Sequence, residues 1–92
     1  MDVYNKLSRL ALDYPELIFD SCGYQELPQE TIDANRKGFD EVSRILKDSV
    51  ENFVSFQNFK PRRDGSLDVR CQTRWSPLFT GVTYIKLEDF KN

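Results

Sequence analysis

The chain has 92 residues, of which 39% are apolar and 30% are charged, and its formal net charge is −2 at pH 7. A chain of this length is too short for two independent cores, so we expect a single domain over residues 1–92. The sequence contains no histidine, the commonest general base and metal ligand in proteins. Catalytic serine–histidine and cysteine–histidine systems and histidine-based zinc sites are therefore excluded.

The two cysteines, Cys22 and Cys71, are too far apart in the chain for a Cys-x-x-Cys motif, so we expect no metal site and no cofactor. One disulfide between them is compatible with the sequence, but the first residues contain no apolar signal segment. We therefore predict a cytoplasmic protein with reduced thiols. The apolar runs do not exceed three residues, as in residues 17–19, far below the roughly 20 residues of a membrane-spanning helix, and we expect no membrane anchor.

The first part of the chain has helical spacing. Apolar residues recur every three or four positions behind Asp2, which is a suitable N-cap, and this helix should stop at Tyr14 because Pro15 follows. A second, short helix is predicted from Pro15 to Cys22, with Gly23 as its terminator.

The third predicted helix has the clearest pattern. It should begin at Pro28 and run to about residue 48, with an apolar stripe on one side and alternating charges on the other. Gly38 lies inside it, at a cost of about 1 kcal/mol relative to alanine. Two interpretations stay open: a close approach of another backbone, or no structural role. Residues 50–56 are ambiguous, because their apolar residues fit both a helix and a strand; we assign a strand from about Asn52.

The rest of the chain has the pattern of an antiparallel sheet. Asp64-Gly65 is a turn signal between two strands, and Ser76-Pro77 separates the second strand from a third over about residues 78–87. The middle strand alternates strictly, which predicts one buried face and one solvated face. The predicted buried face consists of Leu67, Val69, Cys71, Thr73 and Trp75, and the predicted solvated face of Asp68, Arg70, Gln72 and Arg74.

These elements predict an α+β domain in which two or three N-terminal helices pack on one face of a three-stranded antiparallel β-meander. The helical part should cover about residues 2–48 and the meander about residues 52–87. Residues 88–92 should form a tail or a final turn.

Charge is divided between the two halves of the chain. Residues 1–56 hold six basic and eleven acidic side chains, a net charge of −5, whereas residues 57–92 hold seven basic and four acidic ones, a net charge of +3. Either pole could steer a charged partner, although charges on an open sheet face also serve solubility alone. The candidate partner-binding residues are Lys60, Arg62, Arg63, Arg70, Arg74, Glu16 and Asp20.

No catalytic constellation and no nucleotide-binding loop is present in the sequence, so we do not expect an enzyme. The leading hypothesis is a small binding module that acts by protein–protein interaction, as an inhibitor or regulator of the kind carried by phages and other mobile elements. The alternative is nucleic-acid binding through a basic sheet face and the Lys60–Arg63 turn. A third hypothesis is a homodimer formed through the sheet or the helices.

Overall fold

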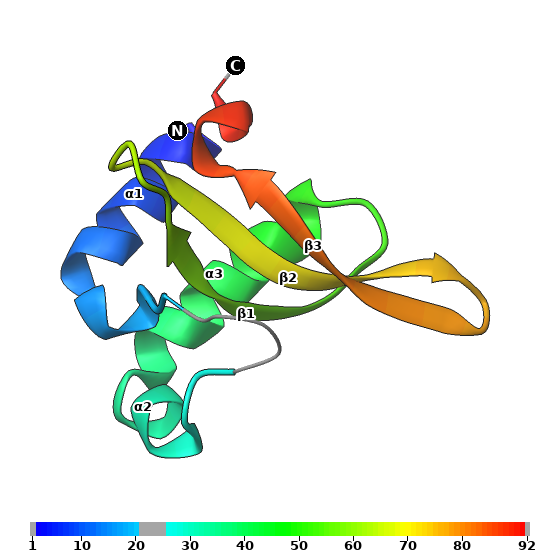
Figure 1. Ribbon diagram of the computed structural model, residues 1–92, viewed down its shortest axis with the longest axis horizontal. Helices are drawn as coiled ribbons and strands as arrows, with labels where there is room; N and C mark the ends of the chain where they lie inside the picture. Colours follow the sequence, from blue (N-terminus) through cyan, green and yellow to red (C-terminus); the bar gives the residue numbers. More distant parts are fainter. Residues whose placement is uncertain (1, 21–25, 92) are drawn as a thin grey trace.

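A computed structural model describes residues 2–20 and 26–91 of the chain. The helices α1 and α3 pack on one face of a three-stranded antiparallel sheet of order β1-β2-β3, and the far end of the β2–β3 hairpin extends beyond them (Figure 1). The predicted α+β architecture is confirmed. In chain order the elements are α1 (Val3–Asp13), η1 (Pro15–Leu17), α2 (Gln29–Ala34), α3 (Arg36–Ser49), β1 (Phe53–Pro61), β2 (Leu67–Ser76), β3 (Phe79–Lys86) and η2 (Leu87–Phe90).

The first helix has the predicted ends. The Asp2 carboxylate accepts a hydrogen bond from the Tyr4 backbone N–H at 3.1 Å, which satisfies one of the unpaired donors of the first turn. The helix ends at Asp13, and Tyr14 leaves the helical conformation directly before Pro15.

The predicted second helix from Pro15 to Cys22 is wrong over its described part. Only a 3₁₀ turn over Pro15–Leu17 forms, and Ile18 is already extended and pairs in parallel with Phe59 of β1. The Phe19 N–H donates to the Phe59 carbonyl oxygen at 2.8 Å. Because Ile18 and Phe59 are about 40 positions apart in the chain, the spacing of neighbouring residues could not reveal their pairing. Cys22 and Gly23, at the end of the predicted helix, lie outside the described residues.

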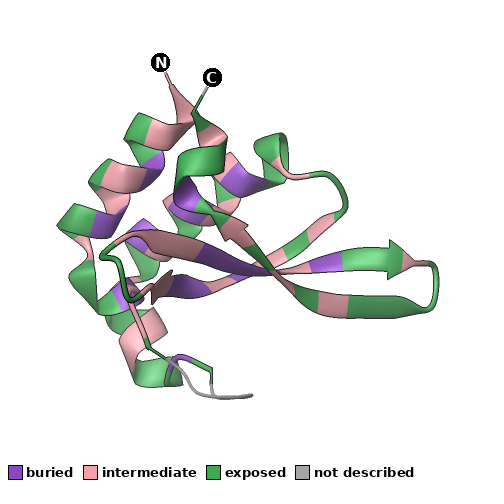
Figure 2. Cartoon of the chain, turned by 45° about the horizontal axis from the view of Figure 1, so that its top comes forward, coloured by how far each residue is buried: buried purple, intermediate pink, exposed green. Residues whose placement is uncertain are grey.

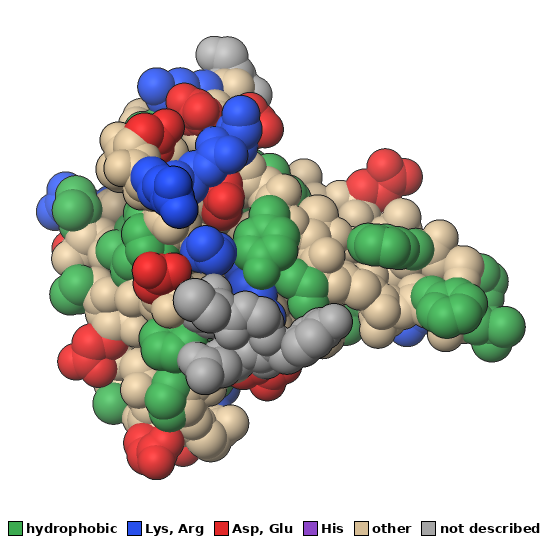
Figure 3. All heavy atoms as spheres, in the orientation of Figure 1, with side chains coloured by type: hydrophobic (Ala, Val, Ile, Leu, Met, Phe, Trp, Pro, Cys, Tyr) green, Lys and Arg blue, Asp and Glu red, His purple; other side chains and the backbone are tan. Residues whose placement is uncertain are grey.

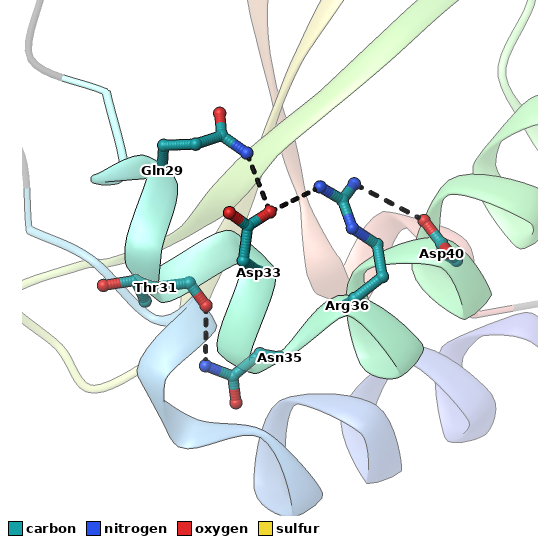
Figure 4. Close-up of polar contacts among 6 residues, drawn as sticks. All are labelled: Gln29, Thr31, Asp33, Asn35, Arg36 and Asp40. Carbon is teal, nitrogen blue, oxygen red and sulfur yellow. Dashed lines mark hydrogen bonds and ion pairs between the residues drawn. The ribbon is translucent and has the colours of Figure 1, made fainter.

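The third predicted helix is divided into α2 and α3 at Asn35, so its predicted continuity is wrong (Figure 4). The Asn35 side-chain amide donates to the Thr31 carbonyl oxygen at 2.8 Å. Asparagine side chains compete in this way with the backbone hydrogen bonds of a helix interior. The break lets α2 take a direction different from that of α3.

Arg36 links the two helices across this break (Figure 4). Its guanidinium lies 2.8 Å from an Asp33 carboxylate oxygen in α2 and 3.9 Å from an Asp40 oxygen in α3. Hydrogen bonds from Gln29 and then Arg36 lower the pKa of Asp33 below its ordinary value. All of these groups are exposed, so the pairs contribute little to stability.

Gly38 in α3 is explained by the close approach of a side chain, and not by that of another backbone. The Tyr14 ring lies against it, and a Cβ atom at this position would be 2.3 Å from Tyr14 Cδ2. Glycine therefore allows the chain after α1 to pack directly on the α3 backbone.

The hydrophobic core lies between the helices and the inner face of the sheet. Phe56 is its aromatic centre, with ring centroids 5.3 Å from Phe39 and 5.1 Å from Phe59, distances typical of favourable aromatic pairs. The buried core residues are Leu7, Ala11, Leu17, Leu27, Val42, Leu46, Phe56, Phe59, Val69 and Leu87.

The strands begin and turn close to the predicted positions. The α3 helix ends at Ser49, and Asn52, with a φ of 62°, leads into β1, so residues 53–56 are strand. Asn52 is one of the residue types that tolerate this left-handed conformation. In the β1–β2 turn Gly65 has a φ of 89°, and an Asp64 carboxylate oxygen accepts from the Ser66 N–H at 3.0 Å.

Candidate protein interface on the hairpin arm

The end of the β2–β3 hairpin extends beyond β1 and the helices (Figure 1). The last residue pair between β1 and β2 is Phe53 with Thr73, and one further backbone hydrogen bond joins Arg74 to Asn52. Beyond it β2 pairs with β3 alone, over Arg74 with Thr80 and Ser76 with Phe79. We call residues 74–82 the arm and the rest of the described chain the body. In Figure 1 the arm projects from the body.

Three large apolar side chains are exposed at the end of the arm. Trp75 is 69% exposed, Leu78 89% and Phe79 68%, and Figure 3 shows hydrophobic side chains gathered there. Single exposed apolar residues are ordinary, but a cluster around one turn is typical of an interaction site. Tryptophan in particular is enriched among the residues that dominate binding energies.

The Trp75 indole is held in position on the arm. Its Nε1–H donates to the Thr73 hydroxyl at 2.9 Å, and that hydroxyl lies 2.7 Å from the Thr83 hydroxyl. The ring lies over Gly81, where a Cβ atom would be 3.1 Å from Trp75 Cζ2, an arrangement in which the aromatic ring covers a glycine in a strand. An indole ordered before binding loses little conformational entropy when a partner covers it.

The strand alternation predicted a buried Trp75, and this prediction is wrong. Val69, Cys71 and Thr73 are buried as expected, but Trp75 is 69% exposed, because the helices that cover this face do not extend to the far end of the β2–β3 hairpin (Figure 2). The tertiary structure thus converts a core-type residue into a surface residue.

Arg70 was expected on the solvated face, and this prediction is also wrong, because Arg70 is only 3% exposed. Its Nη1 donates to the Asn58 side-chain oxygen at 3.2 Å, and the Asn58 amide nitrogen donates to the Phe19 carbonyl oxygen at 2.8 Å. A buried guanidinium needs such partners. Arg70 is therefore part of the structure that joins residues 18–20 to the sheet.

The predicted basic turn is a mixed-charge cleft. Lys60 Nζ lies 3.8 Å from an Asp20 carboxylate oxygen, and Arg62 Nε lies 3.5 Å from an Asp68 oxygen. The structure thus brings together the predicted basic residues of the turn with the predicted acidic residue Asp20. The cleft has a volume of about 470 Å³ and is lined by Asp20, Lys60, Pro61, Arg62, Arg63 and Asp68.

The remaining predicted residues lie elsewhere. The Glu16 carboxylate accepts a hydrogen bond from the Asn35 side chain at 3.2 Å on the helical side of the protein. Arg74 is exposed at the base of the arm, and its N–H donates to the Asn52 carbonyl oxygen at 2.8 Å. The seven predicted residues therefore do not form one continuous surface.

Leu78 and Phe79 were not among the predicted site residues. A usable signal was present, because the segment Trp75–Phe79 places three large apolar residues around Pro77 in a turn. Turns lie at the surface, so apolar residues beside a proline turn can indicate an exposed anchor.

A reactive thiol and a metal site have no support in the described part of the chain. Cys71 is a free and fully buried thiol, and burial raises its pKa to about 11, so the reactive thiolate is disfavoured. No cluster of three or more potential metal-ligating residues occurs within residues 2–20 and 26–91. Over the same residues, every helix is too short or too polar to cross a bilayer.

Comparison with protein families, with curated proteins and with solved structures finds no match to this chain. The geometry of the arm and the body therefore carries the functional argument.

Proposed function

We propose that the protein is a non-enzymatic binding module that acts by protein–protein interaction, with the end of the arm as its docking element. The observation that carries the proposal is the exposure of Trp75, Leu78 and Phe79 on an ordered projection. An arm of this shape can enter a concave surface on a partner and block it, which is how an inhibitor or regulator would act. The proposal includes a cytoplasmic location, which the reduced thiol of Cys71 supports.

The chemistry of the arm favours a protein partner with an apolar pocket. Residues 74–82 contain one charged side chain, Arg74, whereas nucleic-acid binding draws its affinity from the neutralisation of several phosphates. The basic residues of the alternative hypothesis are also less available than expected: Lys60 and Arg62 face carboxylates, and Arg70 is buried.

The decisive experiment compares protein capture by matched variants. The test variant is Leu78→Ser, and the control is Leu12→Ser, because Leu12 is 77% exposed on α1 in the body. We expect the wild type and the control to capture a partner from the source organism. The affinity for this partner should fall at least about tenfold in Leu78→Ser, since truncation of a hot-spot residue costs about 2 kcal/mol or more of binding free energy. Equal capture by all three proteins would contradict the proposal.

The nucleic-acid alternative is tested by gel shift with duplex and single-stranded probes at low salt. If the protein binds through about five phosphates, the logarithm of its affinity should fall with a slope near −4.5 against the logarithm of salt concentration. Charge reversal of Arg62 and Arg63 should then abolish the complex, and Leu78→Ser should not. We expect no complex at all.

A further inference from the structure

The two edges of the sheet are protected to different extents. At the β1 edge, Ile18 pairs with Phe59, and the Phe19 N–H donates to the Phe59 carbonyl oxygen at 2.8 Å. β1 also contains two register shifts and ends with Lys60 and Pro61. Bulges, lysine, proline and a covering segment are the devices by which monomeric proteins prevent pairing at a sheet edge.

The β3 edge has almost none of these devices. Residues 79–85 contain no charged residue and no proline, and the first charge is Lys86 at the end of the strand. Among the described residues no strand lies beside the outer edge of β3, and its register shift with β2 is confined to the turn of the arm. An uncharged strand of this length with an open edge is a template for a further strand.

We infer that the outer edge of β3 pairs antiparallel with β3 of a second copy of this chain. The pairing joins two three-stranded sheets into one six-stranded sheet about a two-fold axis. Since β1 of each copy has two register shifts, pairs with Ile18 at Phe59 and ends with Lys60 and Pro61, the assembly closes as a dimer and does not continue as a fibre. This inference concerns the strand edge and does not depend on the proposed docking role of the arm end.

The side chains of β3 suit self-pairing. Val82 is 36% and Tyr84 47% exposed, and both lie on the sheet face that carries Arg70. In antiparallel pairing about a two-fold axis, directly opposite residues have their side chains on the same face of the sheet. An axis at Thr83 therefore places Val82 of each copy opposite Tyr84 of the other copy, which gives two such pairs. Aromatic and β-branched residues form favourable cross-strand pairs. The antiparallel direction also keeps the two Lys86 side chains at opposite ends of the paired strands.

The test measures mass in solution for the full chain and two matched variants. Val82→Lys adds a charge to the pairing edge, and Val54→Lys adds the same charge at an exposed valine of β1 that is 42% exposed. Sedimentation equilibrium from about 10 to about 500 μM covers the affinities expected of a small interface. We expect the wild type and Val54→Lys to approach twice the monomer mass of 10.8 kDa, and Val82→Lys to stay monomeric with an unchanged circular dichroism spectrum.

Hydrogen exchange locates the contact. Backbone amides of β3 should become more protected as the concentration of the wild type rises, and those of Val82→Lys should not. A wild type that stays monomeric at about 500 μM, well above the dissociation constants of specific interfaces, overturns the inference. So does a dimer that survives Val82→Lys but is lost in Leu78→Ser, because association would then occur through the arm end; this second outcome leaves the proposed docking role intact.

Discussion

The body and the arm are built from the same kinds of residues but use them in opposite ways. In the body, Phe56, Phe59 and Val69 are buried under α1 and α3, whereas in the arm Trp75, Leu78 and Phe79 are exposed. The alternation of β2 continues from Val69 in the body to Trp75 in the arm. The difference shows that an apolar residue in a strand contributes to folding only where another layer covers it, and is otherwise available for binding.

The largest expected difference between the regions is in stability. Phe59→Ala should lower the free energy of unfolding by about 3–5 kcal/mol, because a fully buried ring is removed and a cavity remains. Phe79→Ala in the arm, the matched control, should change it by less than about 0.5 kcal/mol. Urea unfolding followed by circular dichroism measures both. Equal losses would show that the arm is part of the folding unit's core.

The next effect depends on pH and concerns the buried thiol of Cys71. Its pKa is raised to about 11 by burial, from an ordinary value of 9.0, so the unfolded chain loses the proton at a lower pH than the folded chain. The protonated Cys71 thiol therefore makes its full contribution to the free energy of unfolding below about pH 9. Between about pH 9 and 11 this free energy falls by about 1.4 kcal/mol per pH unit. Urea unfolding at pH 8, 9 and 10 should show this loss in the wild type relative to Cys71→Ala, which lacks the buried thiol and keeps only Cys22. Parallel pH profiles would contradict the prediction.

A third test concerns the polar contacts that attach residues 18–20 to the sheet. Asn58→Ala removes the acceptor of Arg70 Nη1 and the donor to the Phe19 carbonyl oxygen. Leaving buried polar groups without these partners should cost about 1–3 kcal/mol. Ser55→Ala, on the same strand but only partly buried, is the control and should cost less than about 1 kcal/mol. A negligible effect of Asn58→Ala would mean that water replaces the lost contacts.

The smallest expected effect on stability is in the arm and has an optical readout. A Cβ atom at Gly81 would lie 3.1 Å from the Trp75 ring, so Gly81→Ala should move the indole and shift its fluorescence while the free energy of unfolding changes by less than about 0.5 kcal/mol. Gly38→Ala is the counterpart in the body, where Tyr14 is confined; the cost of overpacking, about 1–3 kcal/mol, should exceed the gain in helix propensity of about 1 kcal/mol. An unchanged Trp75 spectrum in Gly81→Ala would contradict the ordered indole.

Local chemistry in the sequence was sufficient for much of the fold. Asp2 and Pro15 mark the ends of α1, Asp64-Gly65 and Ser76-Pro77 mark the two turns, and the alternation of residues 67–73 identifies a half-buried strand. Each of these features depends on residues a few positions apart, such as a cap, a turn conformation or a side-chain period of two.

Only the tertiary structure decided which residues are exposed at the proposed docking surface. The pairing of Ile18 with Phe59, the burial of Arg70 and the exposure of Trp75 all result from which distant segment lies over a given face or edge. A periodic pattern states which residues share a face, but not how far the covering layer extends. The candidate site lies where β2 and β3 continue beyond that layer, and the spacing of residues within a strand contains no information on the length of the helices packed against it.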